Sequence, residues 1–131
     1  MHLDYYDKLV RDRIPEIIEK NGNDCHITVL NDEEYLVKLD EKLAEEVGEF
    51  RESHDLEELA DILEVVRAIV SARGSSMEAV EAIREKKREE RGGFEKRIRL
   101  NAIRINDKPA RREIPTELLS AADARRTEIT E

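Results

Sequence analysis

Residues 55–74 read DLEELADILEVVRAIVSARG, and this stretch decides the fold. Apolar residues recur in it at helical spacing, and one face is formed by Leu56, Leu59, Leu63, Val66 and Val70. The apolar surface is extended most of the way round by Ile62, Val65, Ala68, Ile69 and Ala72. A helix that is apolar on almost every side is a central one, buried from several directions. The sequence therefore predicts a central helix that starts at Asp55, with Glu58 completing a capping-box-like pair, and stops at Gly74.

The sequence on either side predicts further helices. A helix over residues 32–53 has Asn31 as its cap and acidic residues in its first turn. Its core stripe consists of Leu36, Leu39, Leu43, Val47 and Phe50. Within residues 3–20 a shorter helix is expected, with Pro15 in its first turn, and residues 25–30 form a β-prone run that we expect to be extended.

The last predicted helix begins at Ser75-Ser76 and stops at Gly92-Gly93. After it, residues 94–100 form a final short helix or an extended segment. The predicted class is therefore all-α, a bundle of four to five helices with one short extended segment. A chain of 131 residues can hardly cover its own apolar central helix, so we expect oligomerisation to complete the bundle. The predicted helical domain spans residues 1–105, and we expect residues 106–131 to form a charged, mobile tail.

The composition of the chain limits the partners, the metal sites and the location that we expect for the protein. A net charge of -9 argues against binding to a nucleic acid polymer. The single Cys25 excludes an internal disulfide and a multi-Cys zinc site. No apolar run approaches the roughly 20 residues of a membrane helix, and the N-terminus shows no signal-peptide stretch. We therefore expect a cytoplasmic protein with no membrane partner.

Acidic side chains interrupt the apolar faces of both long helices. Residues 45–49 read EEVGE and residues 58–61 read ELAD, so each stretch places acids three or four positions apart on one face. Burying carboxylates is costly unless they are paired or coordinate a metal. If the two helices pack antiparallel through a short turn, four groups converge, namely Glu46, Glu49, Glu58 and Asp61. Their oxygens are the ligands that Mg2+ prefers, although a solvated acidic face is the competing interpretation.

Two basic stretches are ambiguous on their own. Residues 86–91 read KKREER, which indicates either cation enrichment at a helix C-terminus or a binding site for an anionic triphosphate. Residues 8–13 read KLVRDR, for which surface salt bridging is the default interpretation. No Ser-His-Asp, Cys-His or Gly-rich phosphate-loop pattern supports covalent catalysis.

Taken together, the acidic motifs and three flanking segments resemble the all-α nucleoside triphosphate pyrophosphohydrolases of the MazG-like superfamily, most closely a house-cleaning subgroup. The segments are residues 8–15 (KLVRDRIP), 31–35 (NDEEY) and 86–94 (KKREERGGF). The resemblance covers about residues 6–100. It implies Mg2+-dependent cleavage of nucleoside triphosphates, non-standard or damaged ones, to the monophosphate and pyrophosphate, with Mn2+ able to substitute.

Site residues follow from the resemblance by position. The implied metal ligands are Glu46, Glu49, Glu58 and Asp61, with Glu45 as a further ligand or helper. Glu46 or Glu49 would take the proton of the attacking water. The implied phosphate-binding residues are Lys87, Arg91, Arg11 and Arg13. A homodimer or homotetramer is the expected assembly. Two alternatives stay open: a phosphoribosyl-ATP pyrophosphohydrolase of histidine biosynthesis, and a non-catalytic helical assembly module.

Overall fold

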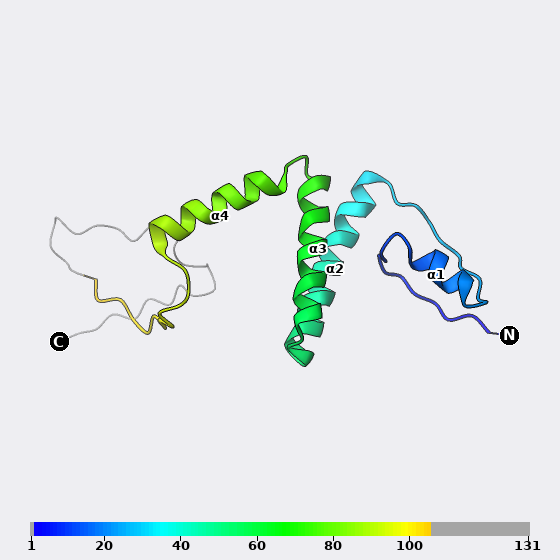
Figure 1. Ribbon diagram of the computed structural model, residues 1–131, viewed down its shortest axis with the longest axis horizontal. Helices are drawn as coiled ribbons and strands as arrows, with labels where there is room; N and C mark the ends of the chain where they lie inside the picture. Colours follow the sequence, from blue (N-terminus) through cyan, green and yellow to red (C-terminus); the bar gives the residue numbers. More distant parts are fainter. Residues whose placement is uncertain (1, 106–131) are drawn as a thin grey trace. The chain divides into compact units, whose positions relative to one another are not determined.

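The computed structural model describes residues 2–105, and in this range the protein is all-helical, with no strand (Figure 1). The helices are α1 (Ile14–Lys20), α2 (Asp32–Ser53), α3 (Leu56–Ala72) and α4 (Met77–Arg91). The predicted all-α class is confirmed. Residues 25–30, expected to be extended, have no regular secondary structure. No described helix is both long enough and apolar enough to cross a membrane.

The chain divides into two units, Met1–Gly93 and Phe94–Glu131, whereas the sequence suggested a boundary after residue 105. All four helices belong to the first unit. In the second unit, residues 94–97 form a turn, closed by a hydrogen bond from the Arg97 N–H to the Phe94 carbonyl. Residues 98–105 have no regular secondary structure, so the range 94–105 contains no fifth helix. The predicted charged tail, residues 106–131, lies outside the described residues.

Helix α2 has the predicted bounds because both of its ends carry clear signals. The Asn31 side chain accepts a hydrogen bond of 2.9 Å from the Glu34 N–H, which satisfies one of the free donors of the first turn. At the other end His54 adopts a left-handed conformation (φ 56°), and its N–H donates to the Phe50 carbonyl. Helix α2 therefore ends in a sharp corner rather than continuing toward Asp55.

The caps of α3 and α4 differ in detail from the prediction. The Asp55 side chain makes no cap hydrogen bond, so the predicted pairing with Glu58 is absent, and the Asp55 N–H instead donates to Ser53 Oγ at 3.1 Å. For α4 the predicted start was only the pair Ser75-Ser76, and the cap is Ser76, since its Oγ accepts from the Ala79 N–H at 3.2 Å. Helix α4 stops as predicted at Gly92, whose φ of 83° is one that glycine adopts readily.

Helix α1 lies within residues 3–20 and has Pro15 in its first turn, as the sequence predicted. It begins at Ile14, where Pro15 supplies a fixed φ at the first turn, and its C-terminal cap is Asn21. Residues 2–12 are not helical and reach α2 and α3 through ion pairs described below. The predicted start signal at Pro15 was therefore correct, and the apolar residues before it do not extend the helix.

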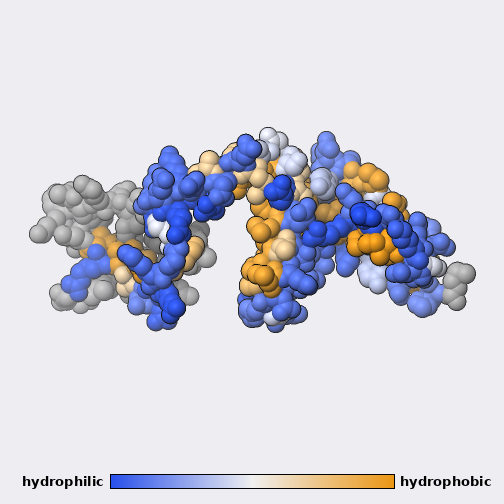
Figure 2. All heavy atoms as spheres, viewed as in Figure 1, coloured by the Kyte–Doolittle hydropathy of each residue, from blue (hydrophilic) through white to orange (hydrophobic). Residues whose placement is uncertain are grey.

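Helices α2 and α3 run antiparallel, because only His54 and Asp55 separate them (Figure 1). Leu39 and Val65 are buried between them, flanked by half-buried residues such as Ile62 and Ile69. The other apolar side of α3 is open: Leu56 is 80% and Leu63 60% exposed, with Leu59 between them, and Figure 2 shows apolar surface along this helix. Within one chain, α3 is thus covered on one side only.

Candidate metal centre

Three predicted metal ligands converge where the C-terminal half of α2 faces the N-terminal half of α3. One ligand atom each from Glu46, Glu58 and Asp61 lies within 4.8 Å of the other two. The short corner at His54 folds α3 back along α2, so residues on either side of it meet in space. Helical spacing then puts Glu58 and Asp61 on the same face of α3.

Glu46 is the unusual member of the cluster. Its side chain is buried, with the residue only 6% exposed, and no donor in the described part of the chain reaches its Oε2 atom. An unsatisfied buried acceptor costs about 1–3 kcal/mol, so a protein keeps one only where something compensates. The pKa of Glu46 is raised above its ordinary value, mainly because the side chain is buried, and the neighbouring Glu49 contributes to the rise. The hydrogen bond and the positive charge of Lys42 act in the opposite direction and lower this pKa.

Lys42 is a site residue that the sequence reasoning missed. Its Nζ lies 3.2 Å from Glu46 Oε1 and 3.2 Å from Glu45 Oε2, and its side chain is 16% exposed. Burial lowers the pKa of Lys42, but the two carboxylates outweigh burial and leave that pKa raised. The signal was present in the sequence, since Lys42 stands three and four positions before Glu45 and Glu46 and therefore on their face.

Glu45 and Glu49 flank the cluster rather than join it. The second oxygen of Glu45 lies 3.7 Å from Lys8 Nζ, so this carboxylate is shared between two lysines. Glu49 is exposed and interacts with Glu46 closely enough to raise the pKa of that residue. Glu49 is not one of the three residues that offer mutually close ligand atoms. Its predicted role as a ligand stays a prediction, whereas its position beside Glu46 suits proton transfer at the rim.

Arg11 and Arg13, the two arginines predicted to bind phosphate, form ion pairs with different parts of the chain. Arg11 Nη2 donates to Asp61 Oδ1 at 2.7 Å, which brings a guanidinium directly onto the cluster. Arg13 pairs with Glu16 at 3.4 Å, three residues further along the chain, and within residues 2–105 it forms no ion pair with the cluster. Of this predicted pair, the structure brings only Arg11 to the candidate metal centre.

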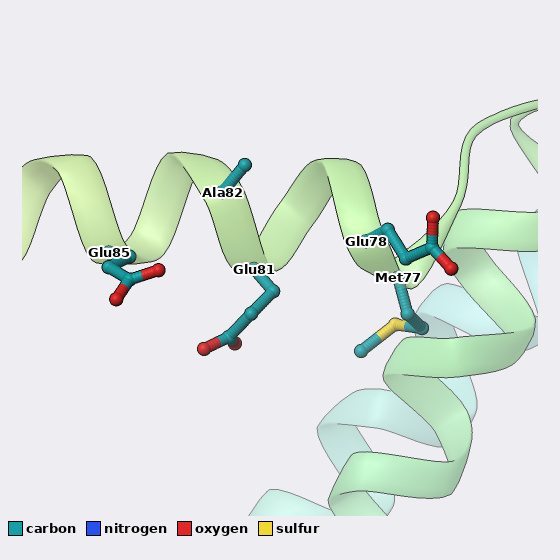
Figure 3. Close-up of a pocket in the computed structure, with 5 residues that line it drawn as sticks. All are labelled: Met77, Glu78, Glu81, Ala82 and Glu85. Carbon is teal, nitrogen blue, oxygen red and sulfur yellow. The ribbon is translucent and has the colours of Figure 1, made fainter.

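Lys87 and Arg91 lie in the second half of α4, where every residue from 81 to 91 is exposed. Within the described residues, neither forms an ion pair with the cluster. Helix α4 also bounds a shallow surface hollow, lined by Met77, Glu78, Glu81, Ala82 and Glu85 (Figure 3). Glu78 and Glu81 point in different directions there, and Arg84 pairs with Glu81. The converging acids of α2 and α3 are therefore the better candidate site.

The donor set fits a hard divalent cation. Two oxygens on opposite sides of Mg2+ stand about 4.2 Å apart, given a bond length of roughly 2.1 Å. Ligand atoms within 4.8 Å therefore need only small side-chain rotations to bind one ion. The free Oε2 of Glu46 is the atom that such an ion would satisfy. Carboxylates also outnumber cations here: Glu45, Glu46, Glu49, Glu58 and Asp61 face Lys8, Arg11 and Lys42.

Comparison with known proteins gives little further guidance. An uncharacterized protein of Mycolicibacterium smegmatis is 54% identical to this chain over 44 residues, which make up 34% of this chain and 45% of that protein. The chain thus spans less than half the length of that relative. No protein-family model matches the chain, and no solved structure matches it.

Proposed function

We propose that this protein is a Mg2+-dependent pyrophosphohydrolase that cleaves nucleoside triphosphates, non-standard or damaged ones, to the monophosphate and pyrophosphate. One observation carries the proposal: the buried Oε2 of Glu46 lacks a partner inside a group of converging carboxylates. A divalent cation held by these carboxylates would satisfy that oxygen. The sequence resemblance to MazG-like enzymes supplies the reaction and the house-cleaning role.

Each residue of the site has a part in the proposed reaction. Glu46, Glu58 and Asp61 would hold Mg2+, with Mn2+ as a substitute. Such an ion lowers the pKa of a bound water and neutralises charge on the leaving pyrophosphate. The exposed Glu49 beside Glu46 would accept the proton of the attacking water.

The cations would bind the substrate. Arg11, already 2.7 Å from Asp61, would turn its guanidinium to the phosphate oxygens. Lys87 and Arg91 would contribute only if the exposed half of an α4, from this chain or from a second copy, lay over the cluster. Their role as phosphate ligands therefore depends on where an α4 lies relative to the cluster, whereas that of Arg11 does not.

The decisive experiment measures pyrophosphate release from a panel of nucleotides with and without Mg2+. Glu49→Gln should lower kcat by about 10²–10⁴-fold, the range for loss of a general base. Asp61→Asn should weaken Mg2+ binding as well as activity. Glu52→Gln is the matched control, because Glu52 is an exposed glutamate one turn further along α2. Unchanged activity in folded Glu49→Gln and Asp61→Asn proteins would count against the proposal.

Two alternatives have their own tests. A phosphoribosyl-ATP pyrophosphohydrolase would use the same carboxylates, so phosphoribosyl-ATP belongs in the substrate panel and would be the preferred substrate. A non-catalytic assembly module is favoured by the open apolar side of α3. Isothermal titration that detects no Mg2+ binding to the folded protein would support that reading.

We also propose that the protein forms a homodimer or homotetramer in which a second copy covers the open side of α3. Leu56, Leu59 and Leu63 would gain burial that one chain does not provide. Sedimentation should then show an oligomer for the native protein and a smaller species for Leu63→Glu. Val29→Glu is a control at an exposed valine outside the helices, and it should leave the oligomer intact.

A further inference from the structure

Two of the three converging carboxylates already form an ion pair with a basic side chain of the protein. Lys42 Nζ lies 3.2 Å from Glu46 Oε1, and Arg11 Nη2 lies 2.7 Å from Asp61 Oδ1. A divalent ion that entered the cluster would therefore meet positive charge next to its own ligands. Because like charges a few ångströms apart repel strongly in a partly buried site, these cations weaken the binding of a bare metal ion.

The two cations differ in their freedom to leave. Arg11 is 57% exposed and belongs to a segment without regular secondary structure, so its side chain can turn into solvent. Lys42 is 16% exposed and is attached to α2 one turn before Glu45 and Glu46. Its ammonium group therefore stays close to any metal that binds Glu46.

We propose that Lys42 is a resident counter-ion that makes the metal centre depend on a polyphosphate ligand. A metal ion alone binds against the charge of Lys42, whereas a metal–polyphosphate complex brings anionic oxygens that the ammonium group can bind. Metal and polyphosphate consequently bind cooperatively, and Lys42 couples them. This inference rests on the proposed function, since it concerns the same site and the same class of substrate.

The coupling has a measurable signature in a charge-removing variant. Lys42→Met should bind Mn2+ alone about tenfold more tightly than the native protein, and preformed Mn2+–pyrophosphate about tenfold more weakly, a size typical of coupling between two ligands. Lys42→Arg keeps the charge and should restore both affinities toward the native values. Electron paramagnetic resonance of Mn2+ measures both affinities on the full chain.

Lys38→Met is the matched control. Lys38 lies one turn earlier on α2 and is similarly shielded, but it pairs with Asp7 and Glu41 rather than with the cluster. Neither affinity should change in this variant. Circular dichroism establishes that the variants are folded, and Lys42→Gln, which also removes the charge, replaces Lys42→Met if that variant is not folded.

Each outcome is decisive. If Lys42→Met binds both Mn2+ and Mn2+–pyrophosphate more weakly, Lys42 merely orients Glu46 and the proposed coupling is wrong. Equal affinities in native and Lys42→Met proteins also overturn it, while leaving the metal site itself in place. If the native protein binds neither form of Mn2+, the proposed function fails first and this inference fails with it.

Discussion

Replacing Glu46 by Met should make the metal-free protein more stable and abolish its response to Mg2+. The native side chain holds a buried oxygen without a partner, which a methionine of similar length removes. The same oxygen is the one that we expect a metal to satisfy. Relative to the native protein, Glu46→Met should therefore be more stable without metal and less stable with Mg2+ bound.

The size of the effect follows from the contacts of Glu46. Removing an unsatisfied buried acceptor gains about 1–3 kcal/mol. Losing the ion pair with Lys42 costs about 0.5 kcal/mol, because Lys42 retains Glu45 as a partner. We therefore expect Glu46→Met to raise the free energy of unfolding by about 0.5–2.5 kcal/mol without metal. At a hundredfold excess of Mg2+ over its Kd, the native protein alone gains about 2.7 kcal/mol.

Urea unfolding followed by circular dichroism measures these quantities, once with a chelator and once with Mg2+ at saturation. The order of stability should reverse: the variant is the more stable protein with chelator, and the native protein is the more stable one with Mg2+. Glu52→Met serves as control, since Glu52 is exposed on the same helix and its replacement should shift stability by less than about 0.5 kcal/mol.

Two results would refute this reasoning. A Glu46→Met protein that is less stable than the native protein in chelator would mean that the carboxylate is well satisfied without metal. A native protein that gains no stability from Mg2+ would mean that the buried oxygen serves something other than a cation. Either result would remove the observation on which the proposed function rests.

Further outcomes follow from the same contacts. Since burial raises the folded-state pKa of Glu46 above its ordinary value of 4.5, folding favours the protonated acid, and metal-free stability should fall as pH rises through that pKa. Glu46→Gln cannot ionise, so its stability advantage in urea titrations should appear above this pKa and vanish at lower pH; a constant difference would contradict the assignment. Ser76→Ala should cost α4 about 1 kcal/mol, visible as faster amide exchange in its first turns, whereas Ser75→Ala should not.

Helix α2 shows how far sequence reasoning reaches when local signals agree. Its cap at Asn31, its acidic first turn and its leucine stripe all indicate the same helix, and the structure has the predicted bounds. The carboxylates converge for the same reason, because two well-defined helices joined by a short corner leave few ways to pack. Periodicity together with an assumed short turn predicted that Glu46, Glu49, Glu58 and Asp61 converge, and three of them offer mutually close ligand atoms, whereas Glu49 is not among these.

Helix α3 shows where that reasoning ends. Because it is apolar almost all round, its pattern does not reveal which side faces α2, and the predicted face through Leu56 and Leu63 is the open one. The buried side carries Val65 instead. Lys42 escaped notice for a related reason: its spacing to Glu46 is visible in the sequence, but only the packed helices show that this pair is shielded from water.

The corner at His54 and Asp55 sets a strict limit on variation in chain length. Successive residues of a helix are rotated by about 100°, so one residue inserted there would swing Glu58 and Asp61 to another side of α3. Helix content would barely change, yet the acids would no longer meet. Relatives that use the same acids should therefore differ in the residues at this corner but conserve their number. A longer corner should differ from it by whole helical turns.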